Sequence, residues 1–399
     1  MKVTFTTFDS VDYIGGPNSW LRRVVPRLRD SGWDVEVLFY IQRGPPEECP
    51  CYRALSDIGI PCKAMPSFKP IFEQAVWLLK ELEKSPPSVF VVNMAIVGYL
   101  ATRWIRRAGI PSIGILHSDD DMYRMIFDDF VIGPPGNRLS DVVCVSDFLL
   151  QDAQGAETDT ALHLIPYGVP IPDQAVNASR DDLRLIYVGR LIEEQKQILE
   201  VTRSLCRAVR EVPGTEAVIY GDGQDRAGVE QIIASENLGG KVRLGGEINN
   251  DHIQDVMLEA DALVLLSDYE GLPIALLEGM ACGLVPICLR IRSGVGQLIE
   301  QGKTGFLVDD RGDDFITAVR TAAADRELRS RISAAARELI VSKYSNDMNA
   351  KLWIELLASR AQEAPHAEVA AANLRRGIRS LEFLEKTVAE SNERMQQAQ

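Results

Sequence analysis

The chain has 399 residues, of which 46% are hydrophobic and 25% charged. This is the composition of a globular protein with room for two domains of about 150 to 200 residues each. The formal net charge of −14 argues against nucleic acid as a partner, because binding a polyanion requires a basic surface.

The first half alternates short apolar or β-branched runs with helical patterns, which predicts a parallel sheet with helices on both faces. A helix is expected over 19–30, with Pro26 removing one interior hydrogen bond or kinking it. The predicted strands are 2–8, 34–40, 61–65, 88–93, 112–116 and 141–145. We assign residues 1–165 to a first domain.

A proline-rich and polar stretch, 166–182, has the composition of a linker between compact units. A second series of strands follows, which predicts a second α/β domain over 183–343. Its strands are 183–188, 216–220, 242–244, 262–266, 285–289 and 306–308.

The C-terminal part reads as helical over 346–360 and 367–395. The tail, 363–399, carries an irregular apolar stripe that predicts packing on its own chain or formation of a homodimer. The stripe consists of Leu374, Ile378, Leu381, Leu384 and Val388.

No secretory signal is expected, because Asp9 follows the first apolar residues directly, and we predict a cytoplasmic protein. The longest weakly polar run, 88–102, is too short for a transmembrane span. The seven cysteines are odd in number and scattered, so free thiols are expected. Neither the cysteines nor the four dispersed histidines predict a metal site.

The most informative segment is SDYEGLPIALLEGMACG, residues 267–283. A buried strand precedes it, Gly271-Leu272-Pro273 breaks the strand, and a helix follows that Gly283 can cap. Glu270 then lies on the loop and Glu278 about two turns into the helix. Two carboxylates so placed fit the two ends of one extended ligand, with a phosphate between them at the helix N-terminus.

These motifs resemble the retaining glycosyltransferases of family 4, also called glycosyl transferases group 1. The resemblance extends from Lys2 to Trp353, with its motifs in the order that the family uses. Besides 267–283, the matching segments are VVCVSDF (142–148), LIPYGV (164–169), LIYVGRLIEEQK (185–196), IYGDGQDR (219–226) and GKTGFL (302–307). The resemblance implies the GT-B fold: two Rossmann-like, doubly wound α/β domains that face a central cleft, with a C-terminal helix over 344–362 that crosses back to the first domain.

The resemblance implies a site for a nucleoside-diphosphate sugar. Arg190 and Lys196 correspond to the pair that binds the diphosphate, for which a planar fork and a point charge are suited. The alternative is that they form surface ion pairs with Glu193 or Glu194. Glu278 corresponds to the carboxylate that binds the ribose hydroxyls.

Further correspondences involve the sugar and the glycine loops. Glu270 and His117 correspond to residues near the donor sugar, although a histidine at a strand end is often structural. Gly15-Gly16 resembles the glycine loop of the first domain, and Gly221 with Gly223 resembles the Gly-x-Gly turn of the second. Gln297 stands where the family commonly has Glu, which predicts altered recognition of sugar hydroxyls.

The implied activity is transfer of a hexose-type sugar from a nucleoside diphosphate to an acceptor hydroxyl with retention of configuration, without a metal or another cofactor. The alternatives are a nucleotide-sugar hydrolase or epimerase on the same fold, and a non-catalytic nucleotide-binding scaffold. The basic and aromatic segments 20–29 and 103–107 predict either solvated helix faces or contact with an anionic membrane surface or an anionic acceptor.

Overall fold

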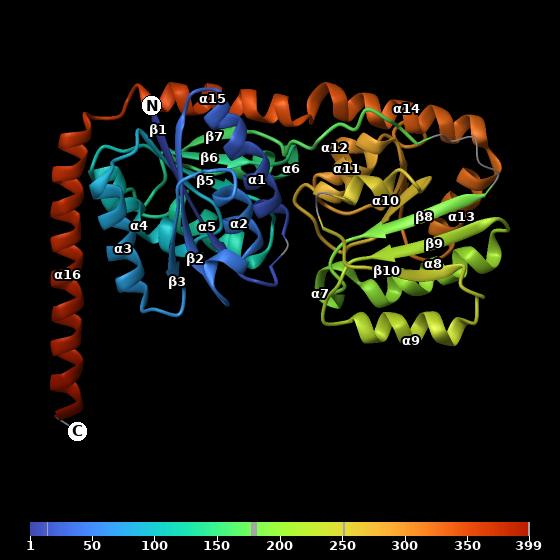
Figure 1. Ribbon diagram of the computed structural model, residues 1–399, viewed down its shortest axis with the longest axis horizontal. Helices are drawn as coiled ribbons and strands as arrows, with labels where there is room; N and C mark the ends of the chain where they lie inside the picture. The colour runs from blue at the N-terminus through green and yellow to red at the C-terminus, as the bar shows by residue number, and fades with distance from the viewer. Residues whose placement is uncertain (14, 177–181, 250–251, 398–399) are drawn as a thin grey trace. The chain divides into compact units, whose positions relative to one another are not determined.

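The computed structural model describes residues 1–13, 15–176, 182–249 and 252–397, with the side chains of 388–397 left undescribed. The chain divides into two compact units (Figure 1). Unit 1 comprises Met1–Val145, Leu150–Ile165 and Asn349–Gln399, and unit 2 comprises Ser146–Leu149 and Pro166–Met348. The described part of the predicted linker belongs to unit 2, and its residues 177–181 lie outside the described residues.

Unit 1 is built on a seven-stranded parallel sheet in the order β3-β2-β1-β4-β5-β6-β7. The strand order reverses at β1, which pairs with β2 on one side and β4 on the other, as in doubly wound folds. The strands are Lys2–Asp9 (β1), Asp34–Ile41 (β2), Cys62–Pro66 (β3), Val89–Val92 (β4), Ser112–Leu116 (β5), Asp141–Cys144 (β6) and Ala161–Leu164 (β7).

Helices and one 3₁₀ turn connect these strands. They are Gly16–Asp30 (α1), Pro46–Glu48 (η1), Pro50–Ser56 (α2), Ile71–Lys84 (α3), Ile96–Arg107 (α4), Asp121–Phe130 (α5) and Asp147–Gln154 (α6). Helix α1 begins three residues earlier than predicted, because Pro17 occupies the first turn, where no backbone N–H is needed. Pro26 lies inside α1 without ending it.

The C-terminal helices are α15 (Asn346–Ala361) and α16 (Ala367–Gln397). From Asn349 onward, α15 belongs to unit 1, where Trp353 packs against Trp20 with ring centroids 5.2 Å apart. Asn349 Oδ1 also accepts a hydrogen bond of 3.1 Å from Trp20 Nε1.

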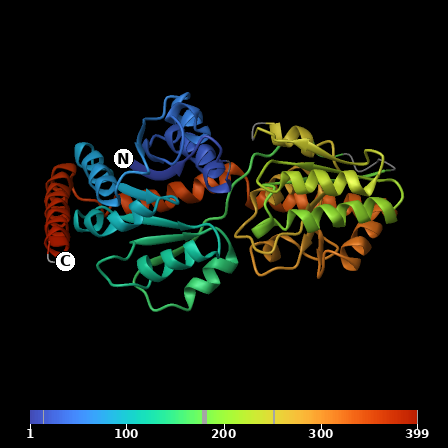
Figure 2. The ribbon, with the colours of Figure 1, turned by 90° about the horizontal axis from the view of Figure 1, so that it is seen from below.

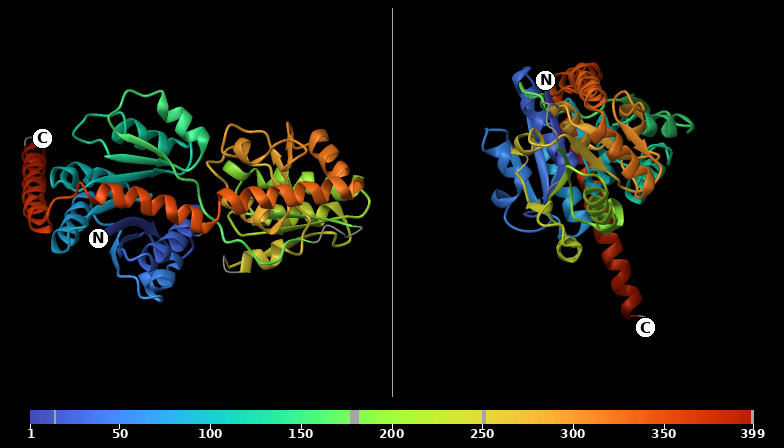
Figure 3. Two further views of the ribbon diagram at one scale, coloured as in Figure 1. Left: turned by 90° about the horizontal axis from the view of Figure 1, so that it is seen from above. Right: turned by 90° about the vertical axis from the view of Figure 1, so that its right-hand side faces the viewer.

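Helix α16 packs along α3 and also contacts α4 (Figure 2). Ion pairs of 2.8 Å between Lys80 and Glu382, and of 2.7 Å between Glu83 and Arg375, connect α16 to α3. The predicted stripe therefore packs on its own chain: Leu374, Ile378 and Leu381 are buried, whereas Leu384 is exposed and the Val388 side chain lies outside the described residues. The C-terminal end of α16 projects from unit 1 (Figure 3).

Unit 2 contains a six-stranded parallel sheet in the order β10-β9-β8-β11-β12-β13. The strands are Leu183–Val188 (β8), Thr215–Tyr220 (β9), Val242–Gly246 (β10), Ala262–Leu265 (β11), Val285–Leu289 (β12) and Phe306–Val308 (β13). The helices are Glu193–Lys196 (α7), Ile198–Glu211 (α8), Arg226–Glu236 (α9), Ile253–Met257 (α10), Ile274–Cys282 (α11), Val295–Leu298 (α12), Asp313–Ala324 (α13) and Arg326–Lys343 (α14).

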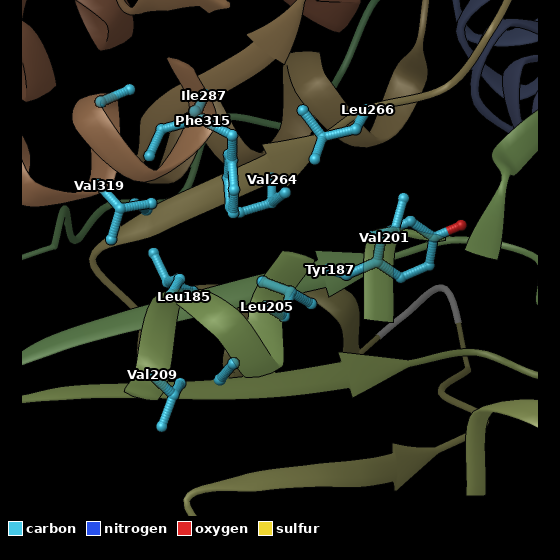
Figure 4. Packing of buried hydrophobic residues seen from close by; sticks show 14 of the residues in the cluster. Leu185, Tyr187, Val201, Leu205, Val209, Val264, Leu266, Ile287, Phe315 and Val319 are labelled. Carbon is cyan, nitrogen blue, oxygen red and sulfur yellow. The ribbon is translucent and has the colours of Figure 1, made fainter. Parts of the chain in front are cut away.

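The core of unit 2 lies between its sheet and helices α8 and α13 (Figure 4). Leu185, Val264 and Ile287 from three neighbouring strands meet apolar side chains of these helices, including Leu205 and Phe315. This core holds the carboxyl ends of the strands in place. The loops that follow them carry most of the predicted site.

The structure confirms the predicted α/β class and the two parallel sheets. The bounds of β5, β8, β12 and β13 agree with the prediction to the residue, and the other predicted strands differ by one or two residues at one or both ends. Strand β7 was not predicted. Its sequence, ALHL, is short, half-buried and interrupted by a histidine, so its pattern alone does not distinguish a strand from a loop.

Candidate active site

Two strand ends of unit 2 bring the predicted residues together. Strands β8 and β11 are parallel neighbours, with Leu185 opposite Ala262. Arg190 follows β8 by two residues, and Glu270 lies on the loop after β11. Since the carboxyl ends of parallel strands lie at the same edge of a sheet, both loops are located where open α/β sheets bind ligands.

Lys196 and Glu270 form an ion pair. The two side chains are only 13% and 8% exposed. Lys196 is the last residue of α7, and Gln197 adopts the left-handed conformation (φ 50°, ψ 42°) before α8 begins. This sharp break between two helices sets the position from which the Lys196 side chain reaches the Glu270 loop.

Gln195 connects Arg190 to the same loop. Its Oε1 accepts a hydrogen bond of 2.8 Å from Arg190 Nη2, and its Nε2 donates one of 3.0 Å to the Tyr269 carbonyl. Its own carbonyl accepts one of 2.9 Å from the Asp268 N–H. Three bonds thus hold the Arg190 side chain beside residues 268–270.

Tyr187, at the margin of the apolar cluster (Figure 4), contacts the loop that carries Arg190. Its hydroxyl donates a hydrogen bond of 3.0 Å to the Arg190 carbonyl. Burial raises the pKa of the Tyr187 phenol, the nearby charge of Glu270 raises this pKa further, and the charge of Arg190 lowers it. The phenol thus responds to charges of opposite sign from the two loops.

The alternative partners, Glu193 and Glu194, are not what Lys196 and Arg190 contact. Glu193 Oε2 accepts a hydrogen bond of 2.9 Å from the Leu199 N–H, and the N–H of Glu193 donates one of 2.7 Å to Asp225. Glu193 thus stabilises the start of α8. The two basic side chains are directed to the loop after β11.

Helix α11 follows this loop. Its N-cap residue, Pro273, provides no side-chain cap, and Gly283 ends it in the left-handed conformation (φ 86°). An N-terminus without a side-chain cap, next to Lys196 and Arg190, suits an anionic group.

Glu278 was expected about two turns into this helix. Because α11 begins at Ile274, Glu278 lies instead about 6 Å along the axis, in the second turn. Its side chain is buried. Burial raises the pKa of the neighbouring Cys282 thiol to about 12, and the charge of Glu278 contributes to this rise.

Gly221 and Gly223 pack against the segment that carries Arg190. Gly221 has φ +136°, and a Cβ there would lie 1.9 Å from the Gly189 carbonyl oxygen. A Cβ on Gly223 would lie 2.4 Å from the Leu191 carbonyl oxygen. Both glycines thus allow the loops after β8 and β9 to approach each other. This close packing explains glycine at both positions without any contact with a ligand.

The segment 293–298 contacts the loop before α11. The Gly294 N–H donates a hydrogen bond of 2.7 Å to the Gly271 carbonyl, and a Cβ on Gly294 would lie 2.5 Å from that oxygen. Gln297, in place of the expected Glu, accepts a bond of 2.8 Å from the Asp147 N–H and donates one of 3.1 Å to the Tyr344 hydroxyl. An amide can both accept and donate here, whereas an ionised carboxylate can only accept.

Arg311 is a residue of this region that the sequence motifs did not indicate. It follows β13, donates from Nε to the Leu266 carbonyl at 2.9 Å, and forms an ion pair with Asp268. Its own carbonyl accepts a bond of 2.7 Å from Ser204 Oγ. A basic residue just after a strand end was the available signal, since that edge of the sheet is where the other charges gather.

The remaining predicted residues belong to unit 1. Gly15 is the N-cap of α1, and Gly16 is its first residue. His117 directly follows β5, is buried, and lies with Nε2 2.6 Å from Asn93 Oδ1. Burial lowers the pKa of His117 to about 3, so its imidazole is neutral at physiological pH.

Three further observations concern cysteines, metals and membranes. All seven cysteines are free. Across the described residues, no three or more His, Cys, Asp or Glu side chains gather as a metal site would require. In the same part of the chain, no helix has the length and apolar character needed to cross a bilayer.

Two family models match consecutive parts of the chain. The model described as glycosyltransferase family 4 matches residues 14–171, and the model described as glycosyl transferases group 1 matches residues 172–339. The chain belongs to the glycosyl transferases group 1 family. The second match contains Arg190, Lys196, Glu270 and Glu278, and the first contains His117.

Named relatives of this group 1 chain include the α-D-kanosaminyltransferase of Streptomyces kanamyceticus, 33% identical over 164 residues. That alignment covers 40% of this chain and 42% of the relative. The sulfoquinovosyl transferase SQD2 of Arabidopsis thaliana is 24% identical over 357 residues, covering 82% of this chain and 67% of the relative. The chain spans about half the length of most of the curated relatives that it matches.

Solved structures support the group 1 fold. The crystal structure of Anabaena Alr3699/HepE in complex with UDP and glucose superposes with a TM-score of 0.74 at 17% identity. The superposition covers 90% of this chain and 100% of that one.

Proposed function

We propose that this chain is a retaining glycosyltransferase that moves a hexose-type sugar from a nucleoside diphosphate to an acceptor hydroxyl. One observation carries the proposal: Arg190, Lys196 and Glu270 are gathered at the carboxyl ends of β8 and β11, beside the start of α11. Cleavage of the glycosidic bond of such a donor puts negative charge on the departing diphosphate. Fixed cations and helix amides at that place stabilise the charge as it develops.

Lys196 has the donor capacity for this role while it remains paired. Its ammonium group carries three N–H donors, and the ion pair with Glu270 uses one of them. The other two are available to phosphate oxygens. Arg190 adds a planar fork on an exposed side chain, which Gln195 orients.

The two carboxylates are assigned to the sugars. Glu278 accepts hydrogen bonds from the ribose hydroxyls, and Glu270 from the hydroxyls of the transferred sugar. The acceptor attacks from the face that the diphosphate leaves, and the leaving phosphate takes its proton. This geometry retains the anomeric configuration and needs no side chain as general base.

The relatives support transfer rather than another reaction of nucleotide sugars. The relatives named above are described as transferases, and HepE was crystallised with UDP and glucose. We therefore infer a uridine diphosphate hexose as the first donor to test. We further propose that transfer requires no metal or other cofactor and that the protein works in the cytoplasm, where its seven free thiols remain reduced.

The proposal is tested first by binding. A ligand that binds only the native state raises the melting temperature, by an amount that grows with concentration over Kd. A panel of nucleoside diphosphates, with and without attached hexoses, identifies the donor. The wild-type chain is compared with Glu278→Gln, which keeps the shape of the side chain and removes its charge. The shift should be largest for one sugar nucleotide and smaller in the variant.

The second test is transfer itself. With the donor identified, the product is analysed by NMR for its anomeric configuration, with and without a metal chelator. An α-configured donor should yield an α-linked product at equal rates in both buffers. An inverted product contradicts the retaining mechanism, and loss of rate with the chelator contradicts metal independence. Release of free sugar at full rate without an acceptor identifies a hydrolase.

A further inference from the structure

Five buried polar side chains of unit 1 form one continuous chain of hydrogen bonds that ends at His117. His117 Nε2 lies 2.6 Å from Asn93 Oδ1, and Asn93 Nδ2 donates to Thr7 Oγ1 at 3.1 Å. Thr7 Oγ1 donates to Asn18 Oδ1 at 3.0 Å. Asn18 Nδ2 lies 3.4 Å from Asp9 Oδ1, at the far end of the chain. All five residues are at most 5% exposed, so solvent does not compete for these bonds.

At the Asp9 end, the hydrogen-bond chain is held by backbone N–H groups, which can only donate. Asp9 Oδ1 accepts from the Ser10 N–H at 3.0 Å, and Oδ2 accepts from the Cys51 and Tyr52 N–H groups at 2.9 Å each. Burial raises the pKa of Asp9, and these three backbone donors together with Asn18 counteract the rise. A carboxylate that faces four donors serves them best when it is ionised and accepts from all of them.

A backbone carbonyl fixes the amide next to this carboxylate. Asn18 Nδ2 donates to the Phe8 carbonyl at 3.0 Å, and a carbonyl can only accept. The amide of Asn18 must therefore turn its nitrogen toward Phe8 and Asp9 and its oxygen toward Thr7. Two acceptors, the Phe8 carbonyl and the Asp9 carboxylate, therefore decide the orientation of this amide.

The orientation of the Asn18 amide then fixes which group donates in each of the following hydrogen bonds. The Thr7 hydroxyl has one proton, and its contact with Asn18 Oδ1 at 3.0 Å is shorter than its contact with the Phe8 carbonyl at 3.3 Å. With that proton used, Thr7 accepts from the Asn93 amide nitrogen. The oxygen of Asn93 then faces the His117 ring, and an oxygen acceptor requires a proton on Nε2.

We propose that Asp9, through Asn18, Thr7 and Asn93, fixes the His117 imidazole in the tautomer that carries its proton on Nε2. These four are positioning residues for His117. Two aromatic rings restrict the imidazole from other sides: Trp20 at 6.2 Å and Tyr123 at 5.7 Å between centroids. The ring is thus held in position by packing and in tautomer by the hydrogen-bond chain.

The tautomer determines what His117 can recognise. A neutral imidazole with its proton on Nε2 can only accept at Nδ1. Any group that meets Nδ1, from this chain or from a ligand, must therefore donate. The part of the inference that concerns catalysis rests on the proposed function and on the family resemblance, by which His117 corresponds to a residue near the donor sugar. The tautomer itself does not depend on it.

The test reads the tautomer directly. The full chain is labelled with ¹⁵N-histidine, and two-bond proton–nitrogen correlations identify which ring nitrogen carries the proton. Among the signals of the four histidines, those of His117 are identified by their absence from the spectrum of His117→Gln. In the wild type, the His117 pattern should show the proton on Nε2 at neutral pH. A proton on Nδ1 of His117 in the wild type overturns the proposal.

The matched variants change one hydroxyl each in the same strand. Thr7→Val removes both bonds of Thr7 and should produce a mixed or reversed tautomer at His117, with kcat lowered about tenfold, the lower end of the loss known for partners that orient metal-bound histidines. Thr4→Val is the control, because Thr4 is equally buried in β1 and its hydroxyl makes no hydrogen bond to the described residues. Thr7→Ser, which restores the hydroxyl, should restore both the tautomer and kcat.

The outcomes separate this inference from the proposed function. If Thr7→Val leaves the Nε2 proton in place while the wild type transfers sugar, the positioning chain is wrong and the proposed function stands. If the tautomer responds as expected but no sugar nucleotide is turned over, the positioning role of the hydrogen-bond chain is correct and the proposed function fails. If Thr7→Val changes the tautomer but not kcat, positioning by these residues plays no part in catalysis.

Discussion

Lys196 and Glu270 form a largely buried ion pair although 74 positions separate them in the sequence. The pairing follows from the adjacency of β8 and β11, which brings the two loops to one edge of the sheet. Each charge offsets the desolvation of the other. Loss of either one leaves the other buried and unpaired, which costs more than the pair contributes.

Lys196→Ala should therefore lose both activity and stability. We expect turnover to fall by orders of magnitude and the free energy of unfolding to fall by about 3 to 5 kcal/mol, the usual cost of breaking a buried pair. Glu270→Ala should destabilise the protein similarly. The double variant should be more stable than either single one, since it leaves no unpaired charge. Urea titrations of the four proteins give this coupling. Additive losses would show that the pair is not a unit in solution.

Arg190→Ala should separate function from stability. The Arg190 side chain is exposed and bonds to Gln195, so its removal should change the free energy of unfolding by less than about 0.5 kcal/mol. If it holds the departing diphosphate, kcat should fall about 100-fold or more. Arg203→Ala, which removes an exposed arginine paired with Glu200 on α8, is the matched control for both measurements. Equal kcat values in the two variants would exclude Arg190 from the site.

Gly221→Ala should displace the loop that carries Arg190, because Gly221 packs against Gly189 of that loop. The residue has φ +136°, and its new Cβ would meet the Gly189 carbonyl at 1.9 Å, so the loops after β8 and β9 must separate. We expect a loss of several kcal/mol in the free energy of unfolding, and weaker binding of nucleoside diphosphate in the folded fraction. Gly296→Ala is the control, because a Cβ there meets nothing within 4 Å. Wild-type stability of Gly221→Ala would contradict the tight packing of these loops.

Most strands could be predicted because they are short, largely buried apolar runs bounded by polar loops, whereas the half-buried β7 was missed. The β8 and β12 bounds agree with the prediction to the residue for this reason. The order of motifs along the chain likewise indicated Arg190, Lys196 and Glu270 as members of one site. The roles of these residues in catalysis remain predictions.

The pairing of side chains could not be predicted from the sequence. Lys196 has Glu194 two residues away, and only the adjacency of β8 and β11 shows that Glu270 is its partner. Gln195 escaped notice because an amide between charged residues carries no signal of its own. The position of Glu278 within α11 was misjudged for a local reason: the helix starts after Pro273, not at Leu272.

The stability of the protein should depend on pH through His117. Burial lowers the folded-state pKa of His117 to about 3, whereas an unfolded chain has a histidine pKa of about 6.5. At a pH between these two pKa values, His117 binds a proton in the unfolded state but not in the folded state. The free energy of unfolding therefore decreases as pH falls below about 6.5. The loss between pH 7.5 and 5.5 should be about 1.4 kcal/mol smaller in His117→Gln than in the wild type. His252→Gln, the same change at an exposed histidine, is the control. Urea midpoints at the two pH values decide the matter, and parallel losses in the wild type and His117→Gln would mean that the imidazole is not held neutral by burial.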